Sequence, residues 1–301
     1  MKREIIMETE ENKIETENKK FNFTKWFFTL VILVVLIVAV ILVEKQYFSK
    51  EKIFTFKPMV QSGILEEAAS AKKSTSSDFW LNSGGLVNFN DSEFSTNMED
   101  LDKDSYWRKL YAKNNPKDTD DGYHPQNIFR LVTRSRWKNL SQQVYFKIED
   151  TILSESDNRN ASNGVLLFNR YQDGDNLYYT GLRVDGQAVI KKKIDDKYYT
   201  LEEKEYFPSN NKYDPKTNPN LIPLNTWIGL KSEVININKD TVEIKLYIDR
   251  EQKGDWQLVI QTQDKDDKYG KKPFFNEGYA GIRTDFMDVK FRDYSIREVD
   301  N

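Results

Sequence analysis

The residues best suited to ligand chemistry in this chain lie on two adjacent β-type segments, 164–171 and 177–184. They combine two phenol rings, an amide and a guanidinium group, and they are Asn169, Tyr171, Tyr179 and Arg183. Phenol rings stack on the apolar C–H faces of sugars, while amide and guanidinium groups orient polar substituents. Strand alternation directs these four side chains away from the core if the core residues are Leu166, Phe168, Leu182 and Val184. We therefore expect a saccharide-binding face here, although the same residues could serve only to stabilise a sheet.

Two further segments could contribute to such a face. Arg130, Arg134 and Arg136 recur at alternate positions of a predicted strand, and their planar groups suit acidic sugars or buried carboxylates. The segment 208–226 is long for a loop in a compact domain, and it carries Tyr213. This loop could form one wall of a groove, or it could only cover the edge of a sheet.

Composition excludes most catalytic centres. The chain has no cysteine and one histidine, His124, so thiolate nucleophiles, zinc–thiolate sites and paired-histidine metal sites are impossible. A net charge of −3 argues against a nucleic-acid partner, which needs a basic face. The adjacent acids Glu149-Asp150 and Glu202-Glu203 would point to opposite faces of a strand. We expect no catalytic residue.

Acid-rich loops could bind a calcium ion, because calcium takes six to eight oxygen ligands, many of them from loops. The best placed are Asp173 and Asp175, which flank Gly174. An Asp-Gly step between two β-rich runs is also a common hairpin turn. We expect no cofactor, with one structural calcium ion as the alternative.

The elements that position these groups are predicted to be β-strands, because apolar and polar residues alternate along the chain. Val144, Phe146 and Ile148 alternate with polar residues, and so do the apolar residues of 242–249. Further strands are predicted at 164–171, 177–184, 188–194, 228–234, 256–261, 279–285 and 289–299. Many short strands separated by turn signals predict an all-β fold, an antiparallel sandwich.

The N-terminal region differs in character. Phe27–Val43 holds seventeen residues without a charge, which predicts a transmembrane signal-anchor helix in contact with the lipid bilayer. We divide the chain into a cytoplasmic tail (1–26), this helix (27–43), a stalk (44–77) with a short helix at 61–70, and an extracytoplasmic domain (78–301). Lysines flank the helix on both sides, so charge bias does not set its orientation. Abundant Lys, Asn and Ile indicate a bacterial genome rich in A and T.

Four stretches of the domain resemble the concanavalin A-like lectin/glucanase superfamily, the laminin-G-type jelly roll. They are GVLLFNRYQDGDNLYYTGLRVDG (164–186), LNTWIGLKSEV (224–234), VEIKLYIDREQKGDWQLV (242–259) and GYAGIRTDFMDVKFRDYSI (278–296). The resemblance implies two curved sheets whose concave face binds saccharide. It also implies a calcium-binding carboxylate in the closing strand, where Arg292 replaces the usual acid and leaves Asp293. The E-x-D-x-x-E motif of its enzymes is absent.

The sequence thus predicts a membrane-anchored lectin-like domain that binds a surface or environmental polysaccharide without cleaving it. Two alternatives remain. One is a divergent glycoside hydrolase or polysaccharide lyase, and the other is a protein-interaction or cell-envelope module without a sugar site.

Overall fold

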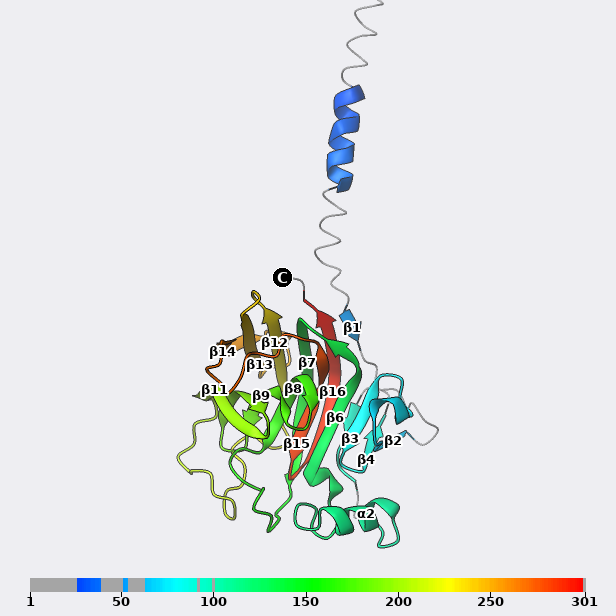
Figure 1. Cartoon of the computed structure of the whole chain (residues 1–301), viewed down its shortest axis with the longest axis vertical. Coiled ribbons are helices and arrows are strands. Elements are labelled where there is room, and N and C mark those ends of the chain that lie inside the picture. Colours follow the sequence, from blue (N-terminus) through cyan, green and yellow to red (C-terminus); the bar gives the residue numbers. More distant parts are fainter. Residues whose placement is uncertain (1–25, 39–50, 54–62, 91–92, 99–100, 300–301) are drawn as a thin grey trace, which may run out of the picture. The chain divides into compact units, whose positions relative to one another are not determined.

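The computed structural model describes residues 26–38, 51–53, 63–90, 93–98 and 101–299 (Figure 1). The chain divides into two compact units, Met1–Ser49 and Lys50–Asn301. In the first unit, residues 26–38 are helical. Residues 1–25 of the predicted tail (1–26) and the last part of the predicted membrane helix, 39–43, lie outside the described residues. Among the described residues, no helix is both long and apolar enough to cross a membrane.

The second unit is a sandwich of two antiparallel sheets. The larger sheet has the strand order β14-β13-β12-β7-β16-β5-β4-β2, with β1 paired to β16. Its strands are β1 (Glu51–Ile53), β2 (Ile64–Glu66), β4 (Leu86–Phe89), β5 (Glu93–Ser95), β7 (Leu140–Thr151), β12 (Ile228–Asn236), β13 (Thr241–Asp249), β14 (Gln257–Lys265) and β16 (Met287–Glu298).

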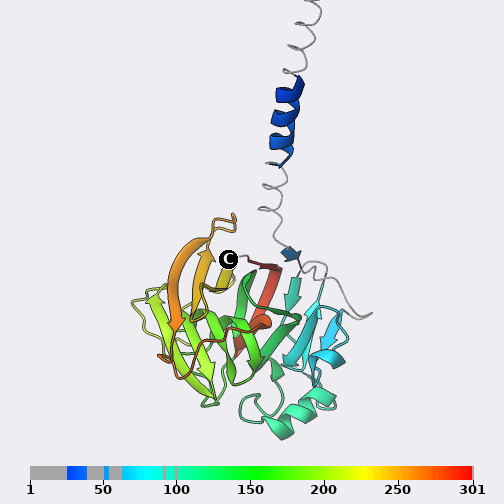
Figure 2. The ribbon, with the colours of Figure 1, turned by 45° about the horizontal axis from the view of Figure 1, so that its top comes forward.

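The smaller sheet has the order β11-β10-β9-β8-β15-β6-β3. Its strands are β3 (Phe79–Ser83), β6 (Ile128–Trp137), β8 (Gly164–Asp173), β9 (Asn176–Arg183), β10 (Gln187–Ile194), β11 (Lys197–Glu205) and β15 (Gly278–Asp285). The helix α2 (Tyr106–Asn114) and the 3-10 turns η1 (Ala71–Lys73) and η2 (Pro125–Asn127) complete the described elements. Figures 1 and 2 show α2 at the end of the sandwich where β6 begins, away from the end where β16 finishes.

The predicted all-β antiparallel sandwich is confirmed, because the alternating apolar residues do form its core. Val144, Phe146 and Ile148 of β7 are fully buried. They belong to one cluster with residues of the facing sheet, such as Val165 and Leu167 of β8. Burying each such side chain contributes about 1.5–3 kcal/mol, and the polar residues between them remain at the surface. The predicted strands from residue 140 onward are all present.

The segment predicted as a stalk is partly built into the sandwich. The predicted helix at 61–70 is wrong, because Ile64–Glu66 forms β2 and pairs with β4. The side chain of Leu65 is only 1% exposed and belongs to the main core, and Ser74 and Ser76 are also buried. The sequence does not reveal this strand, because three residues with one buried leucine are too short to show an alternating pattern.

The facing of β8 was predicted wrongly. Asn169 lies between the sheets, where its Oδ1 accepts hydrogen bonds from Gln142 (2.8 Å) and Ser232 (2.9 Å) of the larger sheet. Leu166 and Phe168 instead lie on the outer face of the smaller sheet, in a second apolar cluster. The core accepts Asn169 because buried partners satisfy its amide. Leu182 and Val184 face the main core, as predicted.

Candidate functional site

The outer face of the smaller sheet carries a cavity of about 440 Å³. Its floor is formed by neighbouring strands, which contribute Ile128 and Arg130 from β6, Arg283 and Asp285 from β15, Leu166 from β8 and Tyr179 from β9. Strand register sets this floor, since Arg283 stands opposite Arg130 on one side and Leu166 on the other. Lys191 of β10 and Tyr198 of β11 border one side, and the loop 152–163 borders another.

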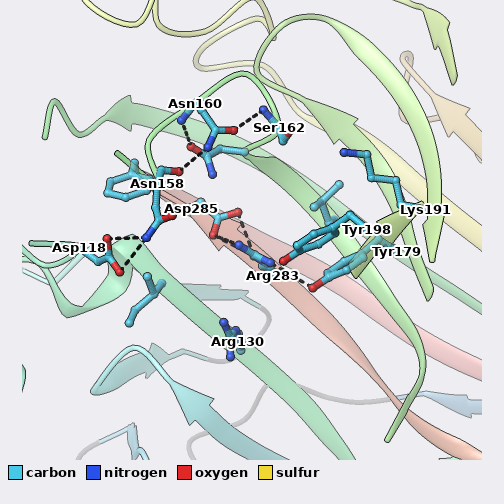
Figure 3. A pocket seen from close by; sticks show the side chains of 14 residues that line it. Asp118, Arg130, Asn158, Asn160, Ser162, Tyr179, Lys191, Tyr198, Arg283 and Asp285 are labelled. Carbon is cyan, nitrogen blue, oxygen red and sulfur yellow. Dashed lines mark hydrogen bonds and ion pairs between the residues drawn. The ribbon is translucent and has the colours of Figure 1, made fainter. Parts of the chain in front are cut away.

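Arg283 lies in the cavity, and hydrogen bonds hold its guanidinium group in place. The Arg283 guanidinium donates to both carboxylate oxygens of Asp285 (2.8 and 3.0 Å) and to the hydroxyl of Tyr179 (3.2 Å), as Figure 3 shows. Burial alone would lower the pKa of Arg283, but the Asp285 carboxylate and the Tyr179 hydroxyl raise it well above its ordinary value. Burial also raises the pKa of Tyr179 to about 12. Arg283 is therefore charged and internally neutralised, and Tyr179 is a neutral phenol.

Two other cations in the cavity lack such partners. Within the described residues, neither the Arg130 side chain nor the Lys191 side chain makes a hydrogen bond or an ion pair. Figure 3 shows Arg130 apart from the Arg283–Asp285 pair. Burial lowers the pKa of Lys191, and the nearby charge of Arg183 lowers it further. Both side chains can offer their donors to a ligand.

An exposed aromatic ring borders the same cavity. Tyr198 is 53% exposed and stacks on Tyr179, with 6.1 Å between ring centroids and 25° between planes. Burial would raise the pKa of Tyr198, but the charges of Arg283 and Lys193 outweigh it and lower that pKa. The Lys193 ammonium also lies over this ring, 5.1 Å from its centroid. The part of the ring that stays exposed is a suitable surface for the C–H face of a sugar.

Amide and hydroxyl groups form the opposite wall. The loop 152–163 contributes Asn158, Asn160 and Ser162, and the Asn158 amide donates to the two carboxylate oxygens of Asp118 (3.0 and 3.2 Å). Arg183 Nε holds this loop through the carbonyl oxygen of Ala161 (3.1 Å). The wall therefore presents neutral hydrogen-bonding groups and one carboxylate.

The structure separates the residues that sequence reasoning grouped together. Tyr179 and Arg130 line the cavity, whereas Tyr171 lines a neighbouring cavity, with its ring stacked on Phe168 at 5.2 Å. Tyr171 and Tyr179 are both almost fully buried, so neither ring is the open platform that was expected. Arg183 positions a loop, and Asn169 is in the core, where it cannot reach a ligand.

The remaining candidates lie elsewhere. Arg134 donates to the carbonyl oxygen of Ser76 (2.7 Å), and Arg136 donates to Gln172 (2.6 Å) and to the carbonyl oxygen of Glu277 (2.7 Å). Tyr213 packs against the main core and lines a much smaller hollow beside the cavity. Of the three arginines predicted to share a face, only Arg130 lines the cavity.

The described residues contain no group of three or more acidic or histidine side chains arranged to hold a metal ion. Asp173 accepts hydrogen bonds from Asp175 N (2.8 Å) and the Asn176 amide, as in a hairpin turn, and Asp175 pairs with Lys193 (3.0 Å). Asp293 lies on β16 in the other sheet, close to Arg292. A structural calcium ion therefore stays a prediction from the sequence.

The cavity offers little for acid–base chemistry. His124 Nδ1 lies 2.9 Å from Asp120, in the loop after α2, and this histidine does not line the cavity. Of the two lining carboxylates, Asp285 is engaged by Arg283, and Asp118 accepts from Ser156 and Asn158. A glycosidase needs a carboxylate that is free to reach the glycosidic oxygen, whereas both of these carboxylates are held by neighbouring donors.

Sequence reasoning missed Lys191, Tyr198 and Arg283. Their relation depends on register, since Lys191 stands opposite Tyr179, and Lys193 opposite Tyr198. The turn signals at Asp185-Gly186 and Asp195-Asp196 mark the two hairpins that create this arrangement. The asparagine-rich run 158–163 was the other available signal.

The chain has low-identity likenesses among solved structures. The carbohydrate-binding module CBM66 from Bacillus subtilis is 17% identical with a TM-score of 0.39, over 57% of this chain and 82% of that one. A Bacillus licheniformis β-glucanase is 10% identical with a TM-score of 0.42, over 84% and 100%. The exoplasmic/lumenal domain of VIP36, in a form bound to Ca²⁺ and Man, is 9% identical with a TM-score of 0.38, over 79% and 91%.

No protein-family model matches the chain, and no curated protein matches it. The likenesses concern the architecture and assign no activity. The predicted fold, an antiparallel sandwich of two sheets, is the fold of the second unit.

Proposed function

We propose that the cavity on the outer face of the smaller sheet binds a saccharide without cleaving it. The observation that carries this proposal is that three suitable side chains line one cavity. They are the exposed ring of Tyr198 and the unpaired side-chain donors of Arg130 and Lys191. A volume of about 440 Å³ lies in the range of small-molecule sites, about 300–1,000 Å³. Its amide, hydroxyl and guanidinium groups suit a ligand rich in hydroxyls.

The absence of cleavage follows from how the two lining carboxylates are used. A retaining glycosidase needs one carboxylate free as a nucleophile and a second that is protonated as an acid. Asp285 is held by Arg283, and Asp118 is held by Ser156 and Asn158, so neither is free for these two roles. Release of reducing ends from a bound glycan would contradict this part of the proposal and favour the hydrolase alternative.

A glycan-binding screen of the full chain in detergent micelles tests the proposal, followed by titration calorimetry on the best ligand. Tyr198→Ala is expected to weaken binding about 5- to 100-fold, because a stacking surface is lost. Tyr106→Ala is the matched control, since Tyr106 is 67% exposed and lines neither cavity described here. Equal losses in the two variants, or no binding to any glycan, would overturn the proposal.

We also propose that Phe27–Val43 anchors the chain in a membrane, with the N-terminus in the cytoplasm and the sandwich outside it. The support is the run of seventeen uncharged residues, which would span about 26 Å as an α-helix. The chain should stay in the membrane fraction through alkaline carbonate washing, and protease added to intact cells should digest or release the sandwich. Extraction by carbonate, or protection until the cells are permeabilised, would contradict the anchor or its orientation, respectively.

A further inference from the structure

A second cavity of about 420 Å³ adjoins the first on the outer face of the smaller sheet. Its walls include Asn82 of β3, Asn114 at the end of α2 and Tyr171 of β8. Both cavities share Ile128 and Arg130, so Arg130 stands at their junction. A chain of sugar units could therefore continue from one cavity into the other past this residue.

The Arg130 side chain reaches across the sheet between the two cavities. Its Nη1 lies 3.9 Å from where a Cβ on Gly174, in the β8–β9 turn, would stand. Its charge acts on the phenol groups of both Tyr171 and Tyr179, one in each cavity, and tends to lower their pKa values. The guanidinium is thus positioned to meet a ligand that occupies both sites.

Arg130 differs from its neighbour Arg283 in one decisive respect. Asp285 neutralises Arg283, whereas the Arg130 guanidinium has no hydrogen-bond or ion-pair partner among the described residues. A half-buried guanidinium without an acceptor is costly, and a carboxylate or sulfate can satisfy it with two parallel hydrogen bonds. Lys191 adds a second unpaired cation on the far side of Tyr179.

We propose that the two cavities form one groove for an acidic saccharide chain, and that Arg130 binds its carboxylate or sulfate group. This inference rests on the proposed saccharide binding and specifies the class of saccharide. The groove also limits the charge density of the ligand. Asp118 in the first cavity and Glu67 in the second would repel further anionic groups. The preferred chain therefore alternates acidic and neutral units.

The experiment compares acidic oligosaccharides with their neutral counterparts on the full chain in detergent. The probes are hyaluronan tetrasaccharide and its carboxyl-reduced form, chondroitin 4-sulfate tetrasaccharide and its carboxyl-reduced and desulfated forms, and xylotetraose with and without one 4-O-methylglucuronate. Heparin hexasaccharide represents dense charge. At least one alternating acidic probe is expected to bind about 10- to 100-fold more tightly than its neutral form, and more tightly than heparin. The chondroitin forms separate the contribution of carboxylate from that of sulfate.

Arg130→Gln should remove this preference, because the acidic form should lose much more affinity than the neutral form does. Arg134→Gln is the matched control, because Arg134 lies on the same strand and does not line either cavity. Thermal unfolding of each variant checks that it is folded. Asn114→Ala, at the exposed end of α2, should weaken binding of the tetrasaccharide but not of the corresponding disaccharide.

The outcomes separate the two proposals. Binding of neutral probes as tightly as acidic ones, an undiminished acidic preference in Arg130→Gln, or tightest binding to heparin would overturn the inference and leave saccharide binding intact. Failure of every probe to bind, together with an empty glycan screen, would overturn both.

Discussion

Lys192 and Asp264 form an ion pair between two fully buried side chains, with 3.0 Å between Nζ and Oδ2. Lys192 lies on β10, next to the edge strand of the smaller sheet, and Asp264 lies on β14 at the edge of the larger sheet, so the pair joins the two sheets. The Tyr178 hydroxyl donates to the same carboxylate oxygen (2.6 Å), and Lys192 also donates to the carbonyl oxygens of Lys271 and Lys272. These contacts hold the segment after β14 against the sandwich.

Removing one partner of this pair should be far more harmful than removing both. Lys192→Met leaves the Asp264 charge buried without its cation, and we expect the free energy of unfolding to fall by about 3–5 kcal/mol. The double variant Lys192→Met/Asp264→Leu should recover most of this loss. Urea unfolding at neutral pH measures both.

Lys245→Met is the control for this comparison, because its pair with Glu243 lies on the partly exposed face of β13 and should contribute about 1 kcal/mol or less. If Lys192→Met lowers the free energy of unfolding no more than Lys245→Met does, then removing Lys192 does not leave Asp264 as an unpaired buried charge, and the prediction is wrong.

Acid should destabilise the sandwich partly through Asp249. Burial would raise the pKa of Asp249, but hydrogen bonds from Tyr145 (2.6 Å) and from the Gly254 amide (2.8 Å) outweigh it and hold the pKa below its usual value. A folded pKa below the unfolded one means that this stabilisation is present above the unfolded pKa, near 3.9, and is lost as pH falls through the folded pKa.

We therefore expect Asp249→Asn to lower stability at pH 7 and to flatten the fall in stability between about pH 5 and pH 2. Urea midpoints at several pH values measure this, with Asp240→Asn in an exposed turn as the control. An unchanged slope in Asp249→Asn would assign the acid sensitivity to other carboxylates.

The strands could be read from the sequence because alternation reports burial directly. The apolar residues of 242–249 face one side, and each of them is buried in the structure. The facing of β8 could not be read in this way, because Asn169 in the core and Arg170 at a positive φ of 52° interrupt the pattern. Arg170 is fully buried and donates to Asn236 and to the carbonyl oxygens of Lys138 and Phe274. Only the tertiary structure supplies these acceptors.

The candidate site was predictable in part for the same reason. Arg130 and Tyr179 were found because each sits at an outward position of a clear strand. Lys191 and Tyr198 were missed because their approach to Tyr179 depends on the pairing register of two successive hairpins. Arg283 was missed because β15 pairs with β8, which is distant in the chain. In the sheet, β15 lies between β6 and β8. This position is set by the topology of the whole domain, so no local pattern in the sequence indicates it.

The calcium prediction can be tested independently of the sugar site. Asp175 pairs with Lys193, and Asp173 is engaged in its own turn, so we expect chelator to lower the melting temperature of the full chain by about 4 °C or less. Differential scanning calorimetry with and without EDTA measures this. Complete unfolding in chelator at ambient temperature would reveal a structural metal ion that these contacts do not account for.

The stacked pair Tyr179 and Tyr198 should separate stability from binding. Tyr179 is 3% exposed and packs edge-on against Phe168 at 5.4 Å, so its truncation leaves a cavity and removes an acceptor from Arg283. We expect Tyr179→Ala to cost about 3–5 kcal/mol, close to Phe168→Ala. Tyr179→Phe should cost less, because the ring remains and only the hydroxyl is lost.

Tyr198→Ala should change stability by about 1 kcal/mol or less, since its ring is largely exposed. Urea unfolding of the four variants provides the test, and a Tyr198→Ala variant as unstable as Phe168→Ala would mean that this ring supports the sheet and is not free to meet a ligand.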